Sequence, residues 1–124
     1  MRNLDWIECM GLLDHYRACD AARDWARRQS SLDLRGLIQA CPQPDWLMWA
    51  AEILWVNRNI ERPTVDLMRV LYNEYGMEVR FIIQHHETDV KTLKKMDDLR
   101  ARYLPRMRKL LLVLIEEDNR EEHQ

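Results

Sequence analysis

The sequence predicts an all-α protein: a compact orthogonal bundle of about six or seven helices in a single domain. Apolar residues recur at intervals of three and four along nearly the whole chain, which is the helical period. Only 3 Gly and 4 Pro are available for the tight turns that connect strands. The 124 residues include 7 Met and many Leu, Arg and Glu, which are good helix formers, and the length suits one domain.

Two short helices are expected at the beginning of the chain. One face of the first carries Leu4, Ile7 and Met10 at helical spacing. Asp20 can cap the second, because its carboxylate accepts hydrogen bonds from the free amides of a first turn. The inner face of this second helix is expected to carry Trp25.

A third short helix and a strongly apolar fourth helix are expected to follow. Ser30 or Ser31 can cap the third helix, which ends at Cys41 because Pro42 favours extended backbone before it. Asp45 is a good start for the fourth helix. Its inner face is expected to carry Trp46, Trp49, Ala50, Ile53 and either Leu54 or Val56.

The second half of the chain predicts two or three longer helices. Pro63 suits the first turn of one helix, and Gly76 suits its end. Residues 77–86 could form a strand or a helix, and we expect a helix because an isolated strand has no partner. Thr88 can cap the last segment, whose inward stripe runs past Pro105. Either one helix kinks at Pro105 or two helices abut there.

The domain is expected to cover residues 1–115. The apolar stripe is lost from residue 116 onward, so residues 116–124 are expected to be an acidic, frayed tail. This segment holds five acidic residues and one Arg, a local charge of about −4, whereas residues 91–109 hold eight Lys or Arg and two Asp, about +6. The whole chain has a formal net charge of −2, which argues against a polycation specialised for nucleic acid.

The cysteines and the first residues favour a cytoplasmic protein. Cys9, Cys19 and Cys41 are odd in number and no secretory signal precedes them, so a disulfide framework is not expected. The longest apolar run, at 110–115, is too short to cross a bilayer, and no membrane partner is expected.

A spacing of cysteines and tryptophans marks residues 12–51. Cys–x5–Trp is followed by Cys–x4–Trp–Leu–x–Trp, and the matching residues are Cys19, Trp25, Cys41, Trp46, Leu47 and Trp49. This pattern resembles a family of short phage and bacterial proteins described as immunity-protein-like, in which Leu stands at the place of Met48. The resemblance implies a helical protein, often of viral or mobile-element origin, that binds another protein in a bacterial host cell. It implies no catalytic residue.

The residues of this pattern have two interpretations. Large rings beside small thiols pack well between helices, so a core role is favoured over an exposed binding cluster. Trp55, together with Trp6 and Tyr16, lies at the end of a segment and is a better candidate for an exposed anchor, although ordinary packing is the favoured interpretation of these residues as well.

No catalytic or metal-binding spacing stands out. His15 and Cys19 are four residues apart and could share a helix face, but no Cys-x-x-Cys or His-x-x-x-His accompanies them. Adjacent residues such as His85 and His86 diverge by about 100° on a helix, so they cannot face one ion. Ser30 and Ser31 lie in no nucleophile motif. We therefore expect no enzyme, no cofactor and no metal.

A basic flank is expected on the last helix. The intervals of four, seven, four and three place its members along one side, and they are Lys91, Lys95, Arg102, Arg106 and Lys109. This flank could be a solvated face, a docking surface for an acidic protein, or a track for a phosphate backbone.

The functional hypothesis is a non-enzymatic interaction protein that inhibits or neutralises a host-defence complex or a toxin by covering its surface. The basic flank and Trp55 are the predicted partner-binding residues. The alternative is a nucleic-acid-binding regulator that uses the basic flank. A homodimer is also open, since helices rich in Met and Leu associate readily.

Overall fold

The computed structural model describes residues 3–85 and 88–122, and these residues form helices and no strand. The all-α class is confirmed. The elements are α1 (Trp6–His15), α2 (Asp20–Arg27), α3 (Leu34–Ala40), α4 (Pro44–Leu54), the 3-10 turn η1 (Val56–Arg58), α5 (Pro63–Gln84) and α6 (Asp89–Glu122).

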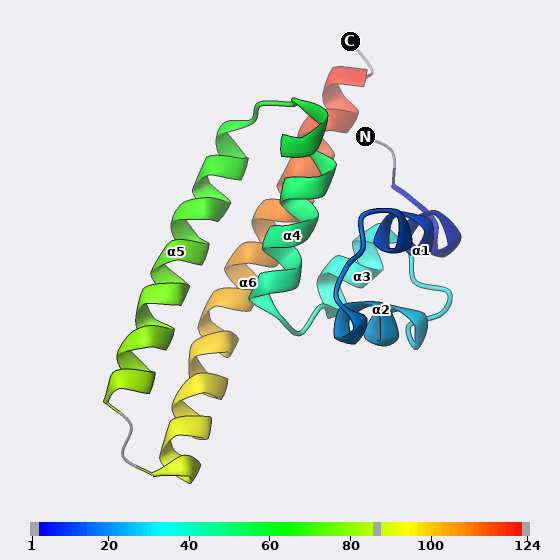
Figure 1. Ribbon diagram of the computed structural model, residues 1–124. Helices are drawn as coiled ribbons and strands as arrows, with labels where there is room; N and C mark the ends of the chain where they lie inside the picture. Colours follow the sequence, from blue (N-terminus) through cyan, green and yellow to red (C-terminus); the bar gives the residue numbers. More distant parts are fainter. Residues whose placement is uncertain (1–2, 86–87, 123–124) are drawn as a thin grey trace.

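The fold has a long helical hairpin at one side and a group of short helices at the other (Figure 1). Helices α5 and α6 run antiparallel, and α4 packs against both of them. Helices α1 and α2 pair with each other, and α3 contacts α6. The core lies mainly between α4, α5 and α6, where Met68, Leu99, Met107, Leu111 and Leu114 are fully buried. The far end of the hairpin extends beyond α4 (Figure 1).

Side chains cap three of the helices at their N-terminal ends. Asp5 accepts from the amide of Glu8 at 2.8 Å while the Glu8 carboxylate accepts from the amide of Asp5 at 3.2 Å, which is a capping box. Thr88 caps α6 as predicted, since its hydroxyl accepts from the amide of Lys91 at 3.2 Å. The third helix is capped by Asp33, whose carboxylate accepts from the amide of Gly36 at 2.8 Å. The prediction of a serine cap there was wrong.

Helices α5 and α6 are longer than the sequence signals indicated. Gly76 lies inside α5, not at its end, and the helix continues to Gln84. The prediction of a helix over 77–86 is thus confirmed as far as Gln84, while residues 86–87 lie outside the described residues. Of the two alternatives at Pro105, a single helix is correct, because α6 passes through it without a break. Ala101 and Pro105 are both exposed, so water can replace the amide donor that Pro105 lacks.

The prediction of a frayed tail was wrong for residues 116–122. These residues form the last turns of α6, and Asp118 is only 5% exposed. Acidic side chains of this segment form ion pairs with earlier parts of the chain: Glu116 with Arg35, and Asp118 and Glu121 with Arg62. The acidic segment therefore packs against the rest of the bundle and does not extend away from it.

Candidate functional site

The residues of the cysteine–tryptophan pattern come together around one apolar groove between α4 and the short helices. The groove has a volume of about 340 Å³. All six pattern residues line it, namely Cys19, Trp25, Cys41, Trp46, Leu47 and Trp49. Its volume falls at the lower end of the range of about 300–1,000 Å³ that is typical of ligand pockets. The core interpretation of the pattern is thus only partly right, since these side chains pack around an open space.

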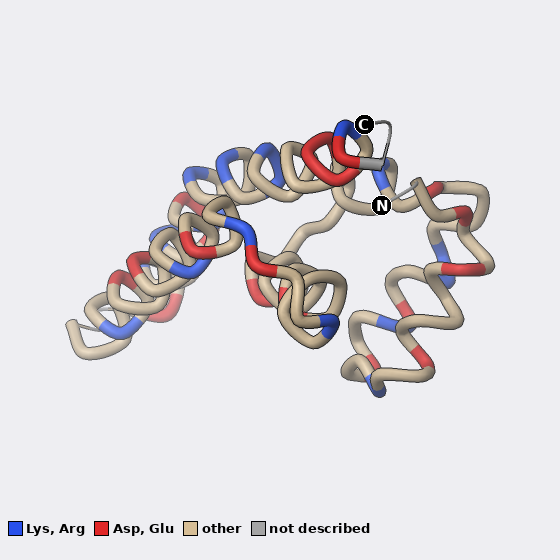
Figure 2. The backbone as a smooth tube through the Cα atoms, turned by 90° about the horizontal axis from the view of Figure 1, so that it is seen from above, with Lys and Arg blue, Asp and Glu red and all other residues tan. Residues whose placement is uncertain are grey.

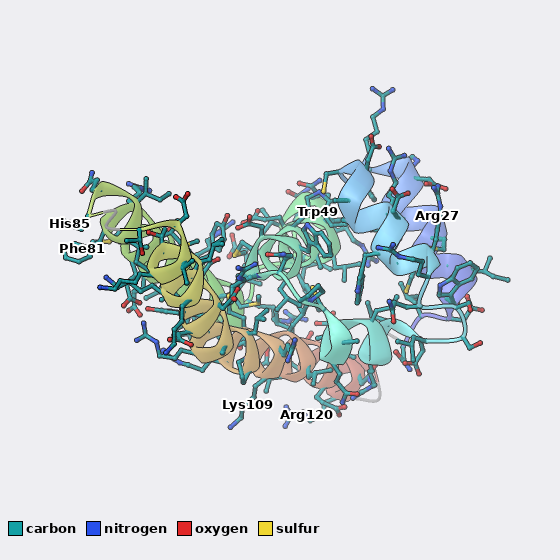
Figure 3. The ribbon with its side chains drawn as sticks, turned by 90° about the horizontal axis from the view of Figure 1, so that it is seen from below. Arg27, Trp49, Phe81, His85, Lys109 and Arg120 are labelled. Atoms are coloured by element: carbon teal, nitrogen blue, oxygen red, sulfur yellow. The ribbon has the colours of Figure 1, made fainter. Side chains whose placement is uncertain are left out.

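Small side chains beside large rings create this space. Ala18, Ala22 and Ala26 are buried on the wall formed by α2 and the turn before it. Trp25 and Trp46 face each other from α2 and α4 with their ring centroids 5.8 Å apart. Both rings are half-buried, as is Trp49, which lies on α4 (Figure 3). Alanine cannot fill the volume beside such rings, so the helices meet without closing the groove.

Hydrogen bonds from two side chains fix the walls of the groove to the rest of the fold. The Trp6 indole Nε1 donates to the carbonyl of Ala26 at 3.1 Å and holds α1 on the end of α2. Arg108 of α6 donates to the carbonyl of Cys41 from Nη2 at 2.6 Å and from Nε at 3.2 Å. The Arg108 guanidinium therefore satisfies a carbonyl at the end of α3, where a helix leaves acceptors unpaired. Trp6 and Tyr16 are both half-buried, which agrees with the packing role that the sequence favoured over an exposed anchor.

The buried thiols of the groove are kept protonated. Burial, followed by the charges of Asp5, Glu8 and Asp33, raises the pKa of Cys9 to about 12. Burial also raises the pKa of the Cys41 thiol above its ordinary value. A protonated thiol is a poor nucleophile and a poor metal ligand. Within residues 3–85 and 88–122, no cluster of three or more His, Cys, Asp or Glu residues could hold a metal ion.

Cys19 differs from the other two cysteines. The sequence favoured a core role for it, but it is the exposed residue that precedes α2. Helix α1 ends at His15, so His15 and Cys19 do not share a helix face as the metal hypothesis required. The Cys19 thiol lies at the groove, where it is open to solvent.

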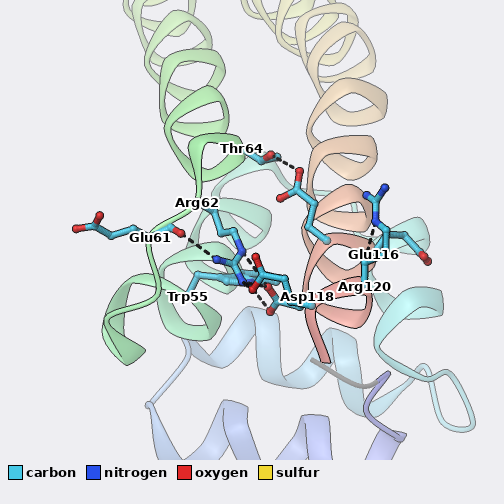
Figure 4. Close-up of polar contacts among 9 residues, drawn as sticks. Trp55, Glu61, Arg62, Thr64, Glu116, Asp118 and Arg120 are labelled. Carbon is cyan, nitrogen blue, oxygen red and sulfur yellow. Dashed lines mark hydrogen bonds and ion pairs between the residues drawn. The ribbon is translucent and has the colours of Figure 1, made fainter. Parts of the chain in front are cut away.

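Trp55 is not the exposed anchor that the sequence suggested. Its side chain is 0% exposed, and its indole Nε1 donates to Oδ2 of Asp118 at 2.8 Å (Figure 4). Arg62 donates to the other oxygen of Asp118 from Nη2 at 2.8 Å and from Nε at 3.1 Å. Asp118 continues the inward stripe of α6, which is formed by Met107, Leu111 and Leu114 at intervals of four and three. This spacing was the signal in the sequence that the Asp118 carboxylate faces the interior and can serve as a polar partner there.

The predicted basic flank lies on the face of α6 that is turned away from the core. All five of its side chains are exposed. Lys and Arg follow the outer edge of α6 in Figure 2, and Lys109 and Arg120 project to the same side in Figure 3. Arg102 pairs with Glu78 of α5 at 3.3 Å, and the Arg106 guanidinium lies 5.6 Å from the centre of the Tyr103 ring. Contacts with their own fold thus already orient the side chains of Arg102 and Arg106.

His85 has a local structural role at the end of α5. Its Nδ1 lies 2.9 Å from the carbonyl of Phe81, and the two rings stack with centroids 4.0 Å apart. This arrangement closes the last turn of the helix. His86, the other histidine of that motif, lies outside the described residues.

Among the described residues, no helix combines the length and the apolar character that crossing a lipid bilayer requires. Comparison with protein-family models, with curated proteins and with solved structures gives no match for this chain. The resemblance to immunity-protein-like proteins therefore rests on the residues of the cysteine–tryptophan pattern alone and stays a prediction.

Proposed function

We propose that this chain is a non-enzymatic interaction protein that neutralises a protein target, a host-defence complex or a toxin, by covering its surface. The resemblance of residues 12–51 suggests a phage or mobile-element origin and a bacterial cytoplasm as the setting. The observation that supports the proposal is the apolar groove, at which half-buried Trp25, Trp46 and Trp49 gather beside small side chains.

The groove suits an apolar side chain of a protein partner. Half-buried tryptophans supply large, rigid contact areas, and rings of this kind dominate the binding energy of many protein interfaces. Protonated Cys9 and Cys41 form apolar parts of the wall and offer no chemistry. A partner that inserts one or two apolar side chains between α2 and α4 would cover these rings and exclude water from them.

The test is binding and inhibition against a panel of purified bacterial toxins and defence complexes, measured by calorimetry and by the activity of each target. Trp49→Ala removes a ring at the groove, and Ile7→Ala is the control because Ile7 is 75% exposed on α1 and does not line the groove. We expect Trp49→Ala to weaken binding about tenfold or more, and Ile7→Ala to leave it within about twofold. Absence of a complex with every member of the panel would contradict the proposal, as would equal binding by both variants.

A second candidate function is nucleic-acid binding through the basic flank. It is favoured by the exposure of all five side chains on one face of a single helix, over a length of about 27 Å. Its test is the anisotropy of labelled duplex DNA and RNA across a salt series. Steep loss of affinity with salt is expected, together with loss of binding in Arg102→Glu/Arg106→Glu but not in Arg17→Glu/Arg58→Glu, whose arginines are exposed elsewhere. No binding at low salt would eliminate this function.

A further inference from the structure

Helix α5 carries an exposed apolar stripe that lies outside the core of the described residues, and one of its rings, Phe81, stacks only on His85 at the end of the same helix. Its members are each 54–65% exposed, and they are Leu67, Val70, Met77 and Phe81. Intervals of three, seven and four place them on one side of the helix. The buried residues of α5, including Val65, Met68 and Tyr75, lie on the other side, against the core. Figure 3 shows Phe81 pointing away from the hairpin.

The polar residues along one edge of this stripe have a self-complementary order. Asp66, Asn73 and Arg80 follow each other at intervals of seven, so they form one row beside the stripe, and all three are exposed. If a second α5 lay antiparallel against the first, Asp66 would face Arg80 of the second copy, and Asn73 would face its own counterpart. A parallel arrangement would place Asp66 beside Asp66 and Arg80 beside Arg80, which repel.

We propose that a second copy of this chain covers the stripe, with the two α5 helices antiparallel about a two-fold axis close to Asn73. An axis within one residue of Asn73 also brings Leu67 opposite Phe81 and Val70 opposite Met77 of the other copy. The apolar pairs and the charged pairs therefore favour the same alignment of the two α5 helices. A two-fold interface of this kind uses the same patch on both subunits, as most homodimers do.

Glu74 lies in the middle of the stripe and sets the strength of this interface. It occupies the one place between Val70 and Met77 where the apolar spacing is interrupted, and it is exposed. A carboxylate close to the two-fold axis lowers the affinity of the two copies for each other. A polar residue within an apolar helix interface also fixes the alignment of the two helices, as it does in coiled coils. The dimer is expected to be reversible and stronger at low salt.

This interface is separate from the groove that supports the proposed function. No residue of α5 lines the groove, so a dimer through α5 leaves both grooves open. Failure of one proposal therefore has no bearing on the other.

The test is sedimentation equilibrium of the full chain and of two charge variants, Asp66→Lys and Arg80→Glu. Each variant alone places two like-charged pairs across the axis, so we expect each to dimerise about tenfold more weakly than the parent chain at low salt. An equimolar mixture of the two variants restores both attractive pairs, and it is expected to associate nearly as strongly as the parent chain. In a parallel contact each variant alone would keep two repulsive pairs, as in the parent chain, so its affinity would not fall. Weakening by each variant together with rescue by the mixture therefore indicates an antiparallel contact between positions 66 and 80.

A second variant keeps the proposal falsifiable if the charged variants lose structure, which circular dichroism and the unfolding midpoint would reveal. Glu74→Leu completes the apolar stripe and is expected to tighten the dimer about tenfold. A parent chain and a Glu74→Leu chain that both stay monomeric to about 1 mM would overturn the proposal. A dimer that is indifferent to Arg80→Glu and Glu74→Leu would also overturn it, because the contact would then lie on another surface.

Discussion

Asp118 is a buried carboxylate whose two oxygens join three segments of the chain. One oxygen accepts from the Trp55 indole and the other from the Arg62 guanidinium, so the end of α4 and the loop before α5 are both tied to α6. Thr64 adds a parallel contact, since its hydroxyl donates to Glu117 at 2.9 Å. A buried donor that loses its acceptor retains the full cost of its desolvation.

Asp118→Ala is expected to lower the free energy of unfolding by about 3 kcal/mol, because it leaves the buried Trp55 indole without its acceptor and removes two hydrogen bonds from Arg62, which keeps its ion pair with Glu121. Urea denaturation followed by tryptophan fluorescence measures the change. The matched control is Asp97→Ala, which removes the exposed partner of Arg100 on the same helix, and we expect it to cost less than about 0.5 kcal/mol. Equal effects of the two substitutions would contradict the buried network.

The three cysteines are expected to react at very different rates. Cys19 is exposed, whereas Cys9 and Cys41 are buried and burial raises the pKa of both thiols. At pH 8, iodoacetamide should add one label per native chain and three labels in denaturant, as read from the intact mass. Cys19→Ser should abolish the native label. Rapid labelling of Cys9 in the native protein would show that the groove opens to solvent down to its buried thiols.

At the scale of the helices, Pro105 lowers the stability of α6, and the packing of this helix against the bundle compensates for the loss. A proline inside a helix lacks one amide donor and crowds the preceding turn, and together these effects cost about 3 kcal/mol relative to alanine. Pro105→Ala is therefore expected to stabilise the protein by about 1–3 kcal/mol in urea denaturation. Pro63→Ala is the control, because Pro63 starts α5, where no donor is needed, and it should not stabilise. A Pro105→Ala variant that is less stable than the parent chain would indicate that the proline gives α6 a shape that the packing of the bundle requires.

The helices show which signals in the sequence were sufficient. The inward stripe of the last segment predicted helix on both sides of Pro105, with Thr88 as the cap, and left open whether one helix or two meet there. One helix forms, because burial of a continuous apolar face outweighs one lost hydrogen bond. Local sequence signals for helix ends were wrong at the places where contacts with distant parts of the chain determine how far the helix extends. Gly76 did not stop α5, since α6 packs along the helix on both sides of it, and the acidic residues after 115 stayed helical because Arg35 and Arg62 bind them.

The candidate site could be predicted only in part. The spacing of cysteines and tryptophans indicated that these residues belong together, and they do line one groove. The groove itself depends on how far α2 stands from α4, which Ala18, Ala22 and Trp46 decide jointly in three dimensions and which no spacing along the chain reveals. The burial of Trp55 was missed for the same reason, since its acceptor lies 63 residues away.

At the scale of the whole molecule, the short helices and the hairpin are held together by different means. Helices α4, α5 and α6 supply most of the core, which also includes Cys9 of α1 and apolar residues of α3, whereas α1–α3 are short and border an open groove. A group of short helices with fewer buried contacts should open without unfolding of the rest. Two polar contacts oppose this opening, from Arg108 to the carbonyl of Cys41 and from Arg35 to Glu116.

Native-state hydrogen exchange tests this difference. Amides of α1 and α2 are expected to exchange at least about tenfold faster than amides of the α6 core around Met107 and Leu111, because they open locally instead of globally. Arg108→Ala should speed exchange in α1–α3 further, since it removes both hydrogen bonds to the carbonyl of Cys41, and should leave α5 almost unchanged. Uniform protection of all six helices would contradict this view, because the groove would then be part of one cooperative unit.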